Sequence, residues 1–165
     1  MQLSERDFLE VIERTPLVSI DLVVQDAAGR VLLGWRSNEP AKNTWFVPGG
    51  RIRKNETLDA AFLRITAAEL GKAAALAEAV PLGAYTHLYK TNFAEVDGIG
   101  THYVVLAYAL RRAELPDRLP AEQHSDYCWL NADEAHRNAE VHPNVLPYFE
   151  ALSGLAGGNK KPAGF

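Results

Sequence analysis

Runs of branched and aromatic residues, separated by turn-forming residues, dominate the pattern of hydrophobic positions along the chain. Such runs predict β-strands. They cover residues 17–25, 30–35, 45–47, 81–89, 101–110 and 127–130. Residues 26–29 (Asp-Ala-Ala-Gly) predict the turn between the first two strands, and residues 48–50 (Pro-Gly-Gly) are expected to stop the third. The connection at residues 111–125 is long and contains prolines, which is typical of a functional loop.

Helical signals precede and divide these strands. Ser4 followed by Asp7 is typical of an N-cap with an acidic first turn, so residues 4–13 are predicted to be a short helix. Residues 58–70 contain neither Gly nor Pro and precede Gly71, the residue type preferred just past a helix.

Two more helices are predicted near the C-terminus. Asn131 and Glu134 have the spacing of a capping box, and Pro143 predicts a helix start near residue 144. Strands, one central helix, more strands and then C-terminal helices predict an α/β fold with a mixed sheet and helices on its faces.

Length and composition fit one globular domain, since the 165 residues are 47% apolar and 23% charged. Residues 1–153 are expected to form this domain, with a short N-terminal arm and helix at residues 1–14 included. Residues 154–165 contain a cluster of Gly and Lys and are expected to be a flexible tail.

Charge and hydropathy exclude two classes of partner. The formal net charge of -4 leaves no strong basic field to hold a nucleic-acid backbone. No apolar stretch reaches the roughly 20 residues of a membrane helix, and the N-terminus lacks the pattern of a signal peptide. We therefore expect a cytoplasmic protein with neither a nucleic-acid nor a membrane partner. The one cysteine, Cys128, cannot form an intrachain disulfide and is expected to pack as a small apolar residue.

Glu69 occupies an unusual position in the predicted central helix. At about 100° per residue, one face of residues 58–70 collects apolar side chains and is expected to turn inward. These side chains are Leu58, Ala61, Phe62, Ile65 and Ala68. Glu69 falls in the same arc, where a carboxylate is costly unless a cation, a metal ion or a proton compensates its charge. The wheel alone leaves open a second interpretation, in which Glu69 reaches solvent at the helix end.

The residues around this helix resemble a known family. Gly50, five residues, Glu56, seven residues, Arg64 and then residues 69–71 (Glu-Leu-Gly) resemble the Nudix box. Nudix enzymes hydrolyse nucleoside diphosphates linked to another group. The resemblance implies an α/β/α sandwich with a mixed sheet, and a loop–helix–loop that binds magnesium and a diphosphate.

The chain departs from the common Nudix pattern at the carboxylates. Where the family usually has Arg-Glu-x-x-Glu-Glu, residues 64–69 read Arg-Ile-Thr-Ala-Ala-Glu. The same reduction occurs in the GDP-mannose mannosyl hydrolase (GDP-mannose glycosyl hydrolase) branch, which this chain resembles along nearly its whole length. The matching segments lie at residues 15–19, 45–51, 56–58, 64–71, 101–106 and 122–130.

The chemistry of that branch supplies the expected function. Water attacks the anomeric carbon of the sugar with inversion, and the products are GDP and the free sugar. The resemblance therefore implies hydrolysis of GDP-mannose, or GDP-glucose, that depends on Mg²⁺, with Mn²⁺ able to substitute. It implies three oxygen ligands for the ion, as a hard cation prefers. They are the backbone carbonyl of Gly49, the carboxylate of Glu69 and the amide oxygen of Gln123.

The same resemblance implies roles for other side chains. His124 is the implied base, and His has the only unperturbed side-chain pKa near neutrality; without the resemblance, a solvated loop histidine explains it better. Asp21 is implied to lie near the sugar or the attacking water. The implied catalytic residues are His124, Asp21, Arg36, His87 and Tyr103. The implied substrate-binding residues are Gln2, Leu3, Phe8, Arg36, Arg51 and Arg64, although Phe8 is equally well explained as a core anchor.

Two other functions fit the same residues. One is a Nudix pyrophosphohydrolase that attacks phosphorus in another nucleoside-diphosphate derivative. The other, less favoured, is a sensor that binds a nucleotide sugar without turnover. Retention of Glu69, Gln123 and His124 favours an enzyme. The expected partners are a small-molecule nucleotide sugar and, from the resemblance, a second copy of the chain in a homodimer.

Overall fold

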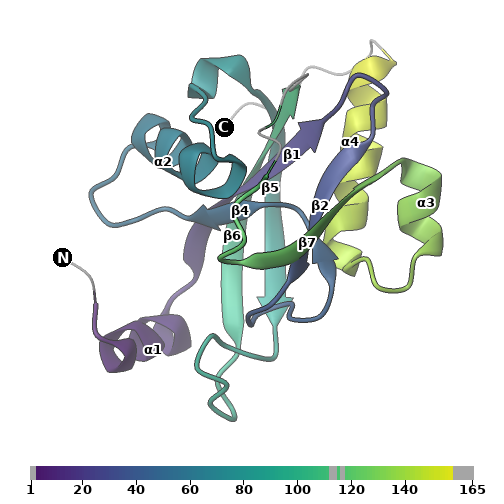
Figure 1. The fold of residues 1–165 in the computed structure, drawn as a ribbon. Helices are drawn as coiled ribbons and strands as arrows, with labels where there is room; N and C mark the ends of the chain where they lie inside the picture. The colour runs from purple at the N-terminus through teal and green to yellow at the C-terminus, as the bar shows by residue number, and fades with distance from the viewer. Residues whose placement is uncertain (1–2, 112–114, 116–117, 158–165) are drawn as a thin grey trace.

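A mixed β-sheet occupies the middle of the molecule, with helices on both of its faces (Figure 1). The computed structural model describes residues 3–111, 115 and 118–157. Its strands are β1 (Leu17–Gln25), β2 (Val31–Arg36), β3 (Trp45–Phe46), β4 (Gly49–Arg51), β5 (Val80–Tyr89), β6 (Thr101–Arg111) and β7 (His124–Leu130). Its helices are α1 (Glu5–Arg14), α2 (Leu58–Leu70), α3 (Ala132–Arg137) and α4 (Leu146–Ala156), with 3-10 turns η1 (Leu76–Glu78) and η2 (Pro143–Val145). Within this described part, no helix combines the length and apolar character needed to cross a membrane.

The described strands form one seven-stranded sheet with the order β3-β2-β1-β6-β5. β1 and β6 run parallel, with Leu17 opposite Tyr103. The other pairs are antiparallel, including β4 on β1 and β7 on β2. β1 is therefore central, and its polar residues Ser19 and Asp21 are buried.

Apolar side chains form a separate cluster on each face of the sheet. On one face, Ile20 of β1 packs with Ile65 of α2. On the other face, Val23 of β1 packs with Tyr148 of α4. Alternate residues of a strand point to opposite faces, so β1 contributes to both clusters. The arrangement confirms the expected α/β/α sandwich with a mixed sheet.

The central helix α2 has the predicted bounds. Gly71 closes it in the left-handed region with φ of 69°, which a residue without Cβ adopts at no steric cost. Glu69 is 6% exposed, so its carboxylate turns inward and does not reach solvent at the helix end.

The expected inward position is wrong for two residues of α2. Leu58 is 39% exposed, because it is the first residue of the helix, and Ala68 at the edge of the arc is exposed. Thr66 is buried instead, and its hydroxyl is satisfied locally. It donates to the carbonyl of Phe62 at 2.8 Å and accepts from the amide of Ala74 at 2.9 Å.

Two strand boundaries also differ from the sequence-based expectation. Gly49 begins β4 rather than ending a strand, because a residue without Cβ can lie close to β1. A Cβ on Gly49 would stand 2.5 Å from the carbonyl oxygen of Ile20. β7 begins at His124 rather than Tyr127, because its pairing with β2 continues as far as Arg36. His124 is therefore a strand residue and not part of the preceding loop.

The expected helix caps at Ser4 and Asn131 are present. Pro143 opens η2, which leads directly into α4, so the helix start expected near residue 144 is confirmed. Since α4 continues to Ala156, the first residues of the expected tail are helical. Residues 158–165 of that tail lie outside the described residues.

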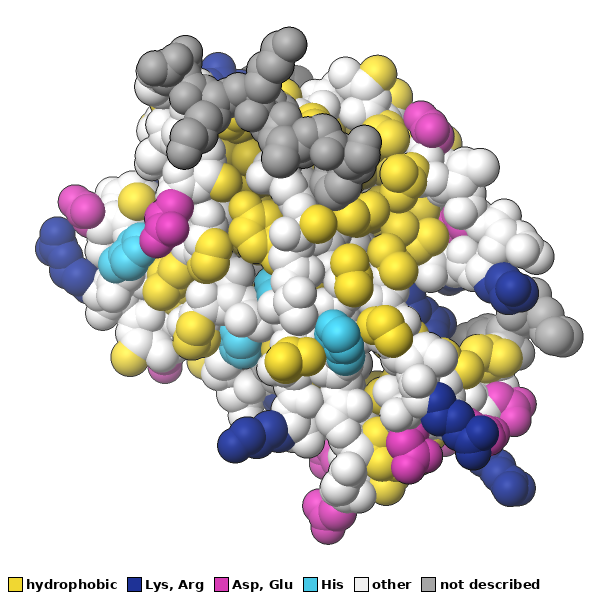
Figure 2. All heavy atoms as spheres, turned by 180° about the vertical axis from the view of Figure 1, so that it is seen from behind, with side chains coloured by type: hydrophobic (Ala, Val, Ile, Leu, Met, Phe, Trp, Pro, Cys, Tyr) yellow, Lys and Arg dark blue, Asp and Glu magenta, His cyan; other side chains and the backbone are white. Residues whose placement is uncertain are grey.

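Hydrophobic side chains are exposed in several places on the face opposite to that of Figure 1 (Figure 2). Val80 and Leu88 of β5, which forms one edge of the sheet, are 46% and 71% exposed. Residues 80–89 contain no Lys, Arg, Asp or Glu. Charged side chains commonly protect sheet edges from pairing; β5 has none, and Pro81 with the irregularity before Gly83 interrupts its edge instead.

Candidate active site

A cavity of about 490 Å³ opens beside the centre of the sheet. Polar residues line it on the sheet side: Ser19, Asp21, Arg36, Gly49, His87, Tyr103 and Gln123. Helix α1 and the β2–β3 and β5–β6 loops line the other side, with Phe8, Ile12, Lys42, Phe93 and Glu95. The cavity therefore joins a charged region at the sheet to an aromatic region farther out.

Asp21 lies at the sheet side of the cavity and is 7% exposed. The hydroxyl of Tyr148 donates a hydrogen bond to its Oδ2 at 2.6 Å. Burial raises the pKa of Asp21 to about 7, although the Tyr148 bond and the charge of Arg36 oppose the rise. A carboxyl group that exchanges a proton near neutral pH is suited to act as a general base.

His87 and Tyr103 face the same cavity from β5 and β6. Burial, and to a lesser degree the neighbouring His142, lowers the pKa of His87 to about 4, so its ring is neutral at pH 7. Its Nε2 lies 3.4 Å from the hydroxyl of Tyr148, which links it to Asp21. Burial raises the pKa of Tyr103, which therefore keeps its proton and remains a hydrogen-bond donor.

Glu69 and Gln123 meet although they are far apart in the chain. The side-chain amide of Gln123 donates to Oε1 of Glu69 at 2.7 Å, and its Oε1 accepts from Nη1 of Arg36 at 3.4 Å. Gln123 lines the cavity, so Glu69 lies one hydrogen bond behind the cavity wall. Burial raises the pKa of Glu69 to about 7, which means that its charge lacks full compensation within the protein.

These groups fit a divalent cation. In the antiparallel pair of β1 and β4, the amide of Leu22 donates to the carbonyl of Pro48, so the next carbonyl, that of Gly49, points away from β1. The Gly49 carbonyl, the Glu69 carboxylate and the Gln123 amide supply oxygen atoms of the kind that Mg²⁺ prefers. Rotating the Gln123 amide by a half turn presents its oxygen instead of its nitrogen. Among the described residues no cluster of three His, Cys, Asp or Glu side chains offers a rival site.

His124 lies outside the lining of this cavity and is 1% exposed. Its Nδ1 stands 3.7 Å from Oε2 of Glu69 and 3.4 Å from the hydroxyl of Tyr127, while its Nε2 finds no hydrogen-bond partner among the described residues. Burial, with Arg36 adding to the effect, lowers the pKa of His124 to about 4. The structure therefore places His124 against Glu69 rather than facing the cavity.

Arg36 presents a guanidinium to the cavity with few competing bonds. It donates to Gln123 and to the carbonyl of Asn38, both at 3.4 Å, and its buried Nε has no partner within the described part of the chain. A weakly engaged guanidinium can form charge-assisted bonds to a phosphate group. Arg51 also lines the cavity, and its guanidinium carbon lies 3.9 Å above the centre of the Phe8 ring.

Arg64 does not line the cavity, and its guanidinium is occupied by Glu56. Nε and Nη2 donate to the two carboxylate oxygens at 2.6 and 2.8 Å, and Nη2 also donates to the carbonyl of Arg51 at 2.9 Å. Glu56 in turn accepts from the amide of Arg53 at 2.9 Å. The structure therefore gives Arg64 and Glu56 a role in fixing the loop before α2, in place of the substrate contact expected for Arg64.

We expect Glu56→Gln to lower the free energy of unfolding by roughly 1 to 3 kcal/mol at neutral pH. The bonds from Arg64 lower the pKa of Glu56 from 4.5 to about 2, so the carboxylate contributes stability above pH 4.5 that is lost as the pH falls toward 2. The difference between wild type and variant should therefore narrow over that range. Urea unfolding at neutral pH and at about pH 3 measures it.

The control for this substitution is Glu10→Gln. Glu10 pairs with Arg14 at 2.9 Å, but the two side chains are 52% and 69% exposed. Such exposed pairs contribute at most about 1 kcal/mol. The structural role of the Arg64–Glu56 pair would be contradicted if Glu56→Gln lost no more free energy of unfolding than Glu10→Gln. It would also be contradicted if that loss were the same at both pH values.

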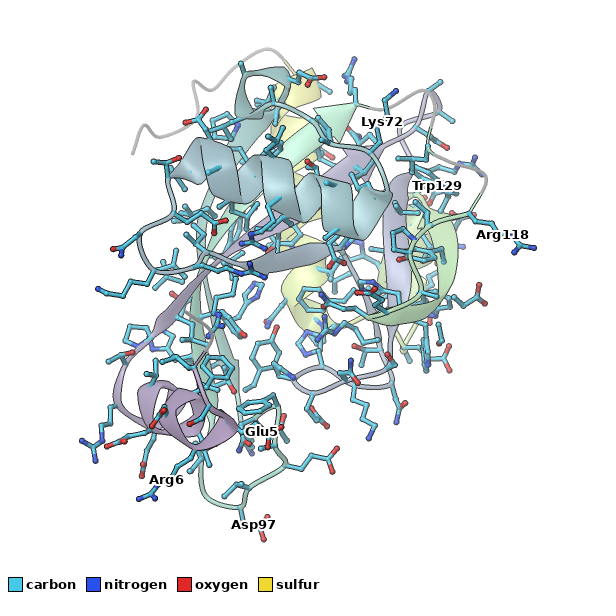
Figure 3. The ribbon with its side chains drawn as sticks, turned by 60° about the vertical axis from the view of Figure 1, so that its left-hand side comes forward. Glu5, Arg6, Lys72, Asp97, Arg118 and Trp129 are labelled. Atoms are coloured by element: carbon cyan, nitrogen blue, oxygen red, sulfur yellow. The ribbon has the colours of Figure 1, made fainter. Side chains whose placement is uncertain are left out.

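The aromatic region of the cavity brings α1 to the β5–β6 loop. The rings of Phe8 and Phe93 lie 5.0 Å apart between centroids. Figure 3 shows the two elements side by side, with Glu5 and Arg6 labelled on α1 and Asp97 on the loop. Leu3 is 45% exposed and does not line the cavity, and Gln2 lies outside the described residues.

Two residues of the site were missed by sequence reasoning. Tyr148 bonds to Asp21 across 127 positions of the chain, and no local pattern marks it among the other tyrosines. Phe93, the partner of Phe8, stands in a loop without periodicity. An aromatic residue in a loop is the only signal that the sequence offered for it.

Comparison with known proteins adds a family match and one curated relative. The NUDIX domain family matches residues 15–149 of this chain. The chain is 40% identical over 144 residues to the low-salt glycan biosynthesis protein Agl8 of Haloferax volcanii, covering 86% of this chain and 85% of that protein.

Solved structures share the fold at lower identity. The MutT protein of Methanosarcina mazei Go1 has a TM-score of 0.66 at 17% identity, covering 87% of this chain and 97% of its own. The NUDIX domain of Shewanella oneidensis NrtR, complexed with ADP ribose, has a TM-score of 0.65 at 18% identity, covering 93% and 99%. The MutT NUDIX hydrolase of Burkholderia pseudomallei has a TM-score of 0.65 at 23% identity, covering 84% and 99%. These likenesses show the fold alone.

Proposed function

The chain belongs to the NUDIX domain family, and from that premise we propose that it hydrolyses a GDP-sugar, GDP-mannose or GDP-glucose, to GDP and the free sugar. The observation that carries the proposal is the placement of its buried carboxylates. Among the described residues these are Asp21 and Glu69, one in the cavity wall and one behind it. Attack at carbon with inversion needs one group that activates water. Asp21 can take that role, and Glu69 can hold a cation.

A divalent ion, Mg²⁺ with Mn²⁺ able to substitute, is part of the proposal. Gly49, Glu69 and Gln123 would hold it, as their oxygen atoms fit a hard cation. When bound, the ion neutralises charge on the diphosphate and makes GDP a better leaving group. Nudix hydrolases generally use divalent metals, which supports this assignment.

The diphosphate would lie between this site and two arginines. Arg36 lines the cavity with unsatisfied donors, and Arg51 lines it from β4. Neutral His87 and protonated Tyr103 can donate hydrogen bonds to the sugar or to the leaving oxygen. Phe8 and Phe93 would wall the nucleoside, since aromatic rings suit a planar base. Arg64 is left out of this assignment, because Glu56 occupies its guanidinium.

Two residues are candidates for the base. His124 matches the branch, but it is 1% exposed and does not line the cavity that Asp21 faces. It lines instead a second cavity of about 530 Å³, beside Tyr127 and Trp129. Asp21 lines the cavity and has a pKa near 7, which favours it as the base. Attack by water requires one such group on the face of the sugar opposite the leaving diphosphate.

The name of the Haloferax volcanii relative, low-salt glycan biosynthesis protein Agl8, supports a sugar-linked substrate. In a rival proposal, the protein is a Nudix pyrophosphohydrolase, and water attacks phosphorus of another nucleoside-diphosphate derivative. The ADP ribose bound to the NrtR domain supports a second rival, in which the cavity binds a nucleotide derivative without turnover.

One experiment separates these three proposals. Purified protein with Mg²⁺ is given a panel of nucleotide sugars in ¹⁸O-labelled water; mass spectrometry locates the label in the products, and proton NMR identifies the anomer first formed. We expect GDP release from GDP-mannose or GDP-glucose with the label in the free sugar, whose anomer is inverted in the first minutes. Label in a phosphate group would contradict attack at carbon and support attack at phosphorus. Binding of a nucleotide sugar without any product would support the sensor.

A homodimer belongs to the same proposal. The edge strand β5 supports it, because three of its four exposed residues, Val80, Ala84 and Leu88, are apolar and residues 80–89 contain no Lys, Arg, Asp or Glu. The mass in solution, measured by light scattering, tests it against the 18.2 kDa of one chain.

A further inference from the structure

Gly34 in β2 lies under the ring of His124. A Cβ on Gly34 would stand 2.4 Å from Cδ2 and 2.5 Å from Cγ of His124, and 2.9 Å from its Cβ. Two carbon atoms approach no closer than about 3.5 Å without repulsion. The imidazole therefore rests directly on the backbone of β2, in space that any other residue at position 34 would fill.

The pairing of β2 with β7 explains this close contact. Gly34 is opposite Tyr127 and Arg36 is opposite His124, with a register shift between the two pairs. Between these pairs, one residue of β2 (Trp35) is opposite two residues of β7 (Ser125 and Asp126), which is the geometry of a bulge. A bulge turns a side chain away from its regular direction, and here it brings the His124 ring over Gly34.

The other side of the ring faces Glu69. Nδ1 of His124 lies 3.7 Å from Oε2 of Glu69, while Oε1 of the same carboxylate accepts from Gln123. Tyr127 holds the ring from a third direction, with its hydroxyl 3.4 Å from Nδ1 and ring centroids 5.4 Å apart. The imidazole is thus enclosed by β2, Tyr127 and the inward carboxylate of α2.

We propose that Gly34 is a positioning residue, whose missing side chain lets His124 pack against Glu69 and hold that carboxylate toward Gln123. The role in binding the divalent ion rests on the proposed function. In this arrangement the His124 ring contacts Glu69 from within the protein. Partners that orient a metal ligand commonly change metal affinity by 10- to 100-fold when they are lost.

The first test is Gly34→Ala, with Mn²⁺ binding measured by calorimetry in the absence of substrate. We expect the dissociation constant for Mn²⁺ to rise by about 10- to 100-fold. The matched control is Gly154→Ala in α4, where a new Cβ meets no group within 4 Å, so its Mn²⁺ affinity should equal that of the wild type. Unchanged Mn²⁺ affinity in folded Gly34→Ala would overturn the proposal.

The second test compares the same substitution in two backgrounds. His124→Ala empties the space above Gly34, so adding Gly34→Ala should cause no further loss of Mn²⁺ affinity and no further fall in the melting temperature. Equal losses in both backgrounds would show that Gly34 acts without His124, and would overturn the proposal. If Gly34→Ala alone does not fold, recovery of a folded protein in the double variant supports the contact, and failure of the double variant to fold contradicts it.

The proposed function can fail separately from this inference. If the wild type binds no Mn²⁺, the proposed metal site is wrong. The melting temperatures of the four proteins still report whether Gly34 and His124 are coupled, because non-additive effects mark residues in direct contact. If the two substitutions are coupled in melting temperature but not in Mn²⁺ affinity, Gly34 serves packing alone and the proposed positioning role is overturned.

Discussion

Glu69→Gln is expected to abolish hydrolysis that depends on Mg²⁺, with a fall in kcat/KM of roughly 10²- to 10⁴-fold. The estimate corresponds to loss of the several kcal/mol that a bound metal contributes to a transition state. Glutamine keeps the size of the side chain but removes the charge, and Glu69 is the one carboxylate among the proposed ligands. GDP release measured over a range of Mg²⁺ concentrations, with Mn²⁺ calorimetry beside it, tests the expectation.

The melting temperature shows whether Glu69→Gln loses activity at the site or because the protein unfolds. Burial raises the pKa of Glu69 to about 7, so the metal-free protein loses stability as the pH rises through that value. Glutamine carries no charge to bury, and metal-free Glu69→Gln should therefore melt at or above the wild-type temperature at a pH of about 8. Mg²⁺ should raise the melting temperature of the wild type but not that of the variant.

The control is Glu122→Gln, which removes a charge close to the site. Glu122 is exposed, and its charge contributes to the raised pKa of Glu69. Its loss should leave Mg²⁺ binding and turnover close to those of the wild type. Substantial activity in Glu69→Gln, or an equal loss in the control, would remove Glu69 from the proposed metal site.

The part of the site that could be predicted from the sequence is the part built by one continuous segment. The sequence from Gly50 to Gly71 predicted the loop and the helix with its bounds, but residues 48–50 were expected to stop a strand, so β4 was missed. Helical geometry put Glu69 in the inward arc but left open a position in solvent at the helix end, and the structure shows the inward position. The resemblance assigned Arg64 to substrate binding, and no local pattern showed that Glu56 would occupy its guanidinium.

The rest of the site depends on contacts between distant segments. Tyr148 reaches Asp21 only after α4 packs on the sheet, and Phe8 meets Phe93 only when α1 folds beside the β5–β6 loop. His124 was expected in a loop, where a histidine is free to meet water. The bulge between β2 and β7 buries it instead, and a bulge leaves no mark in a single sequence.

Asp21→Asn is expected to lower kcat by about 10²- to 10⁴-fold with little change in KM, because a base acts in the transition state rather than in binding. Asparagine keeps the shape and can still accept a bond from Tyr148, but it cannot take a proton from water. Steady-state kinetics with the preferred GDP-sugar, together with the affinity for GDP, measure the two effects separately. Asp97→Asn in the β5–β6 loop is the control, since that exposed carboxylate lies outside the cavity lining.

The same measurements on His124→Gln decide between the two candidate bases. If His124 acts through Glu69, its loss weakens metal binding, and high Mg²⁺ restores much of the rate. Loss of the base in Asp21→Asn has no such remedy, because no concentration of metal supplies a proton acceptor at that position. A His124→Gln variant that stays inactive at saturating Mg²⁺, beside an active Asp21→Asn, would return the role of base to His124 and require the ring to leave its place over Gly34 during turnover.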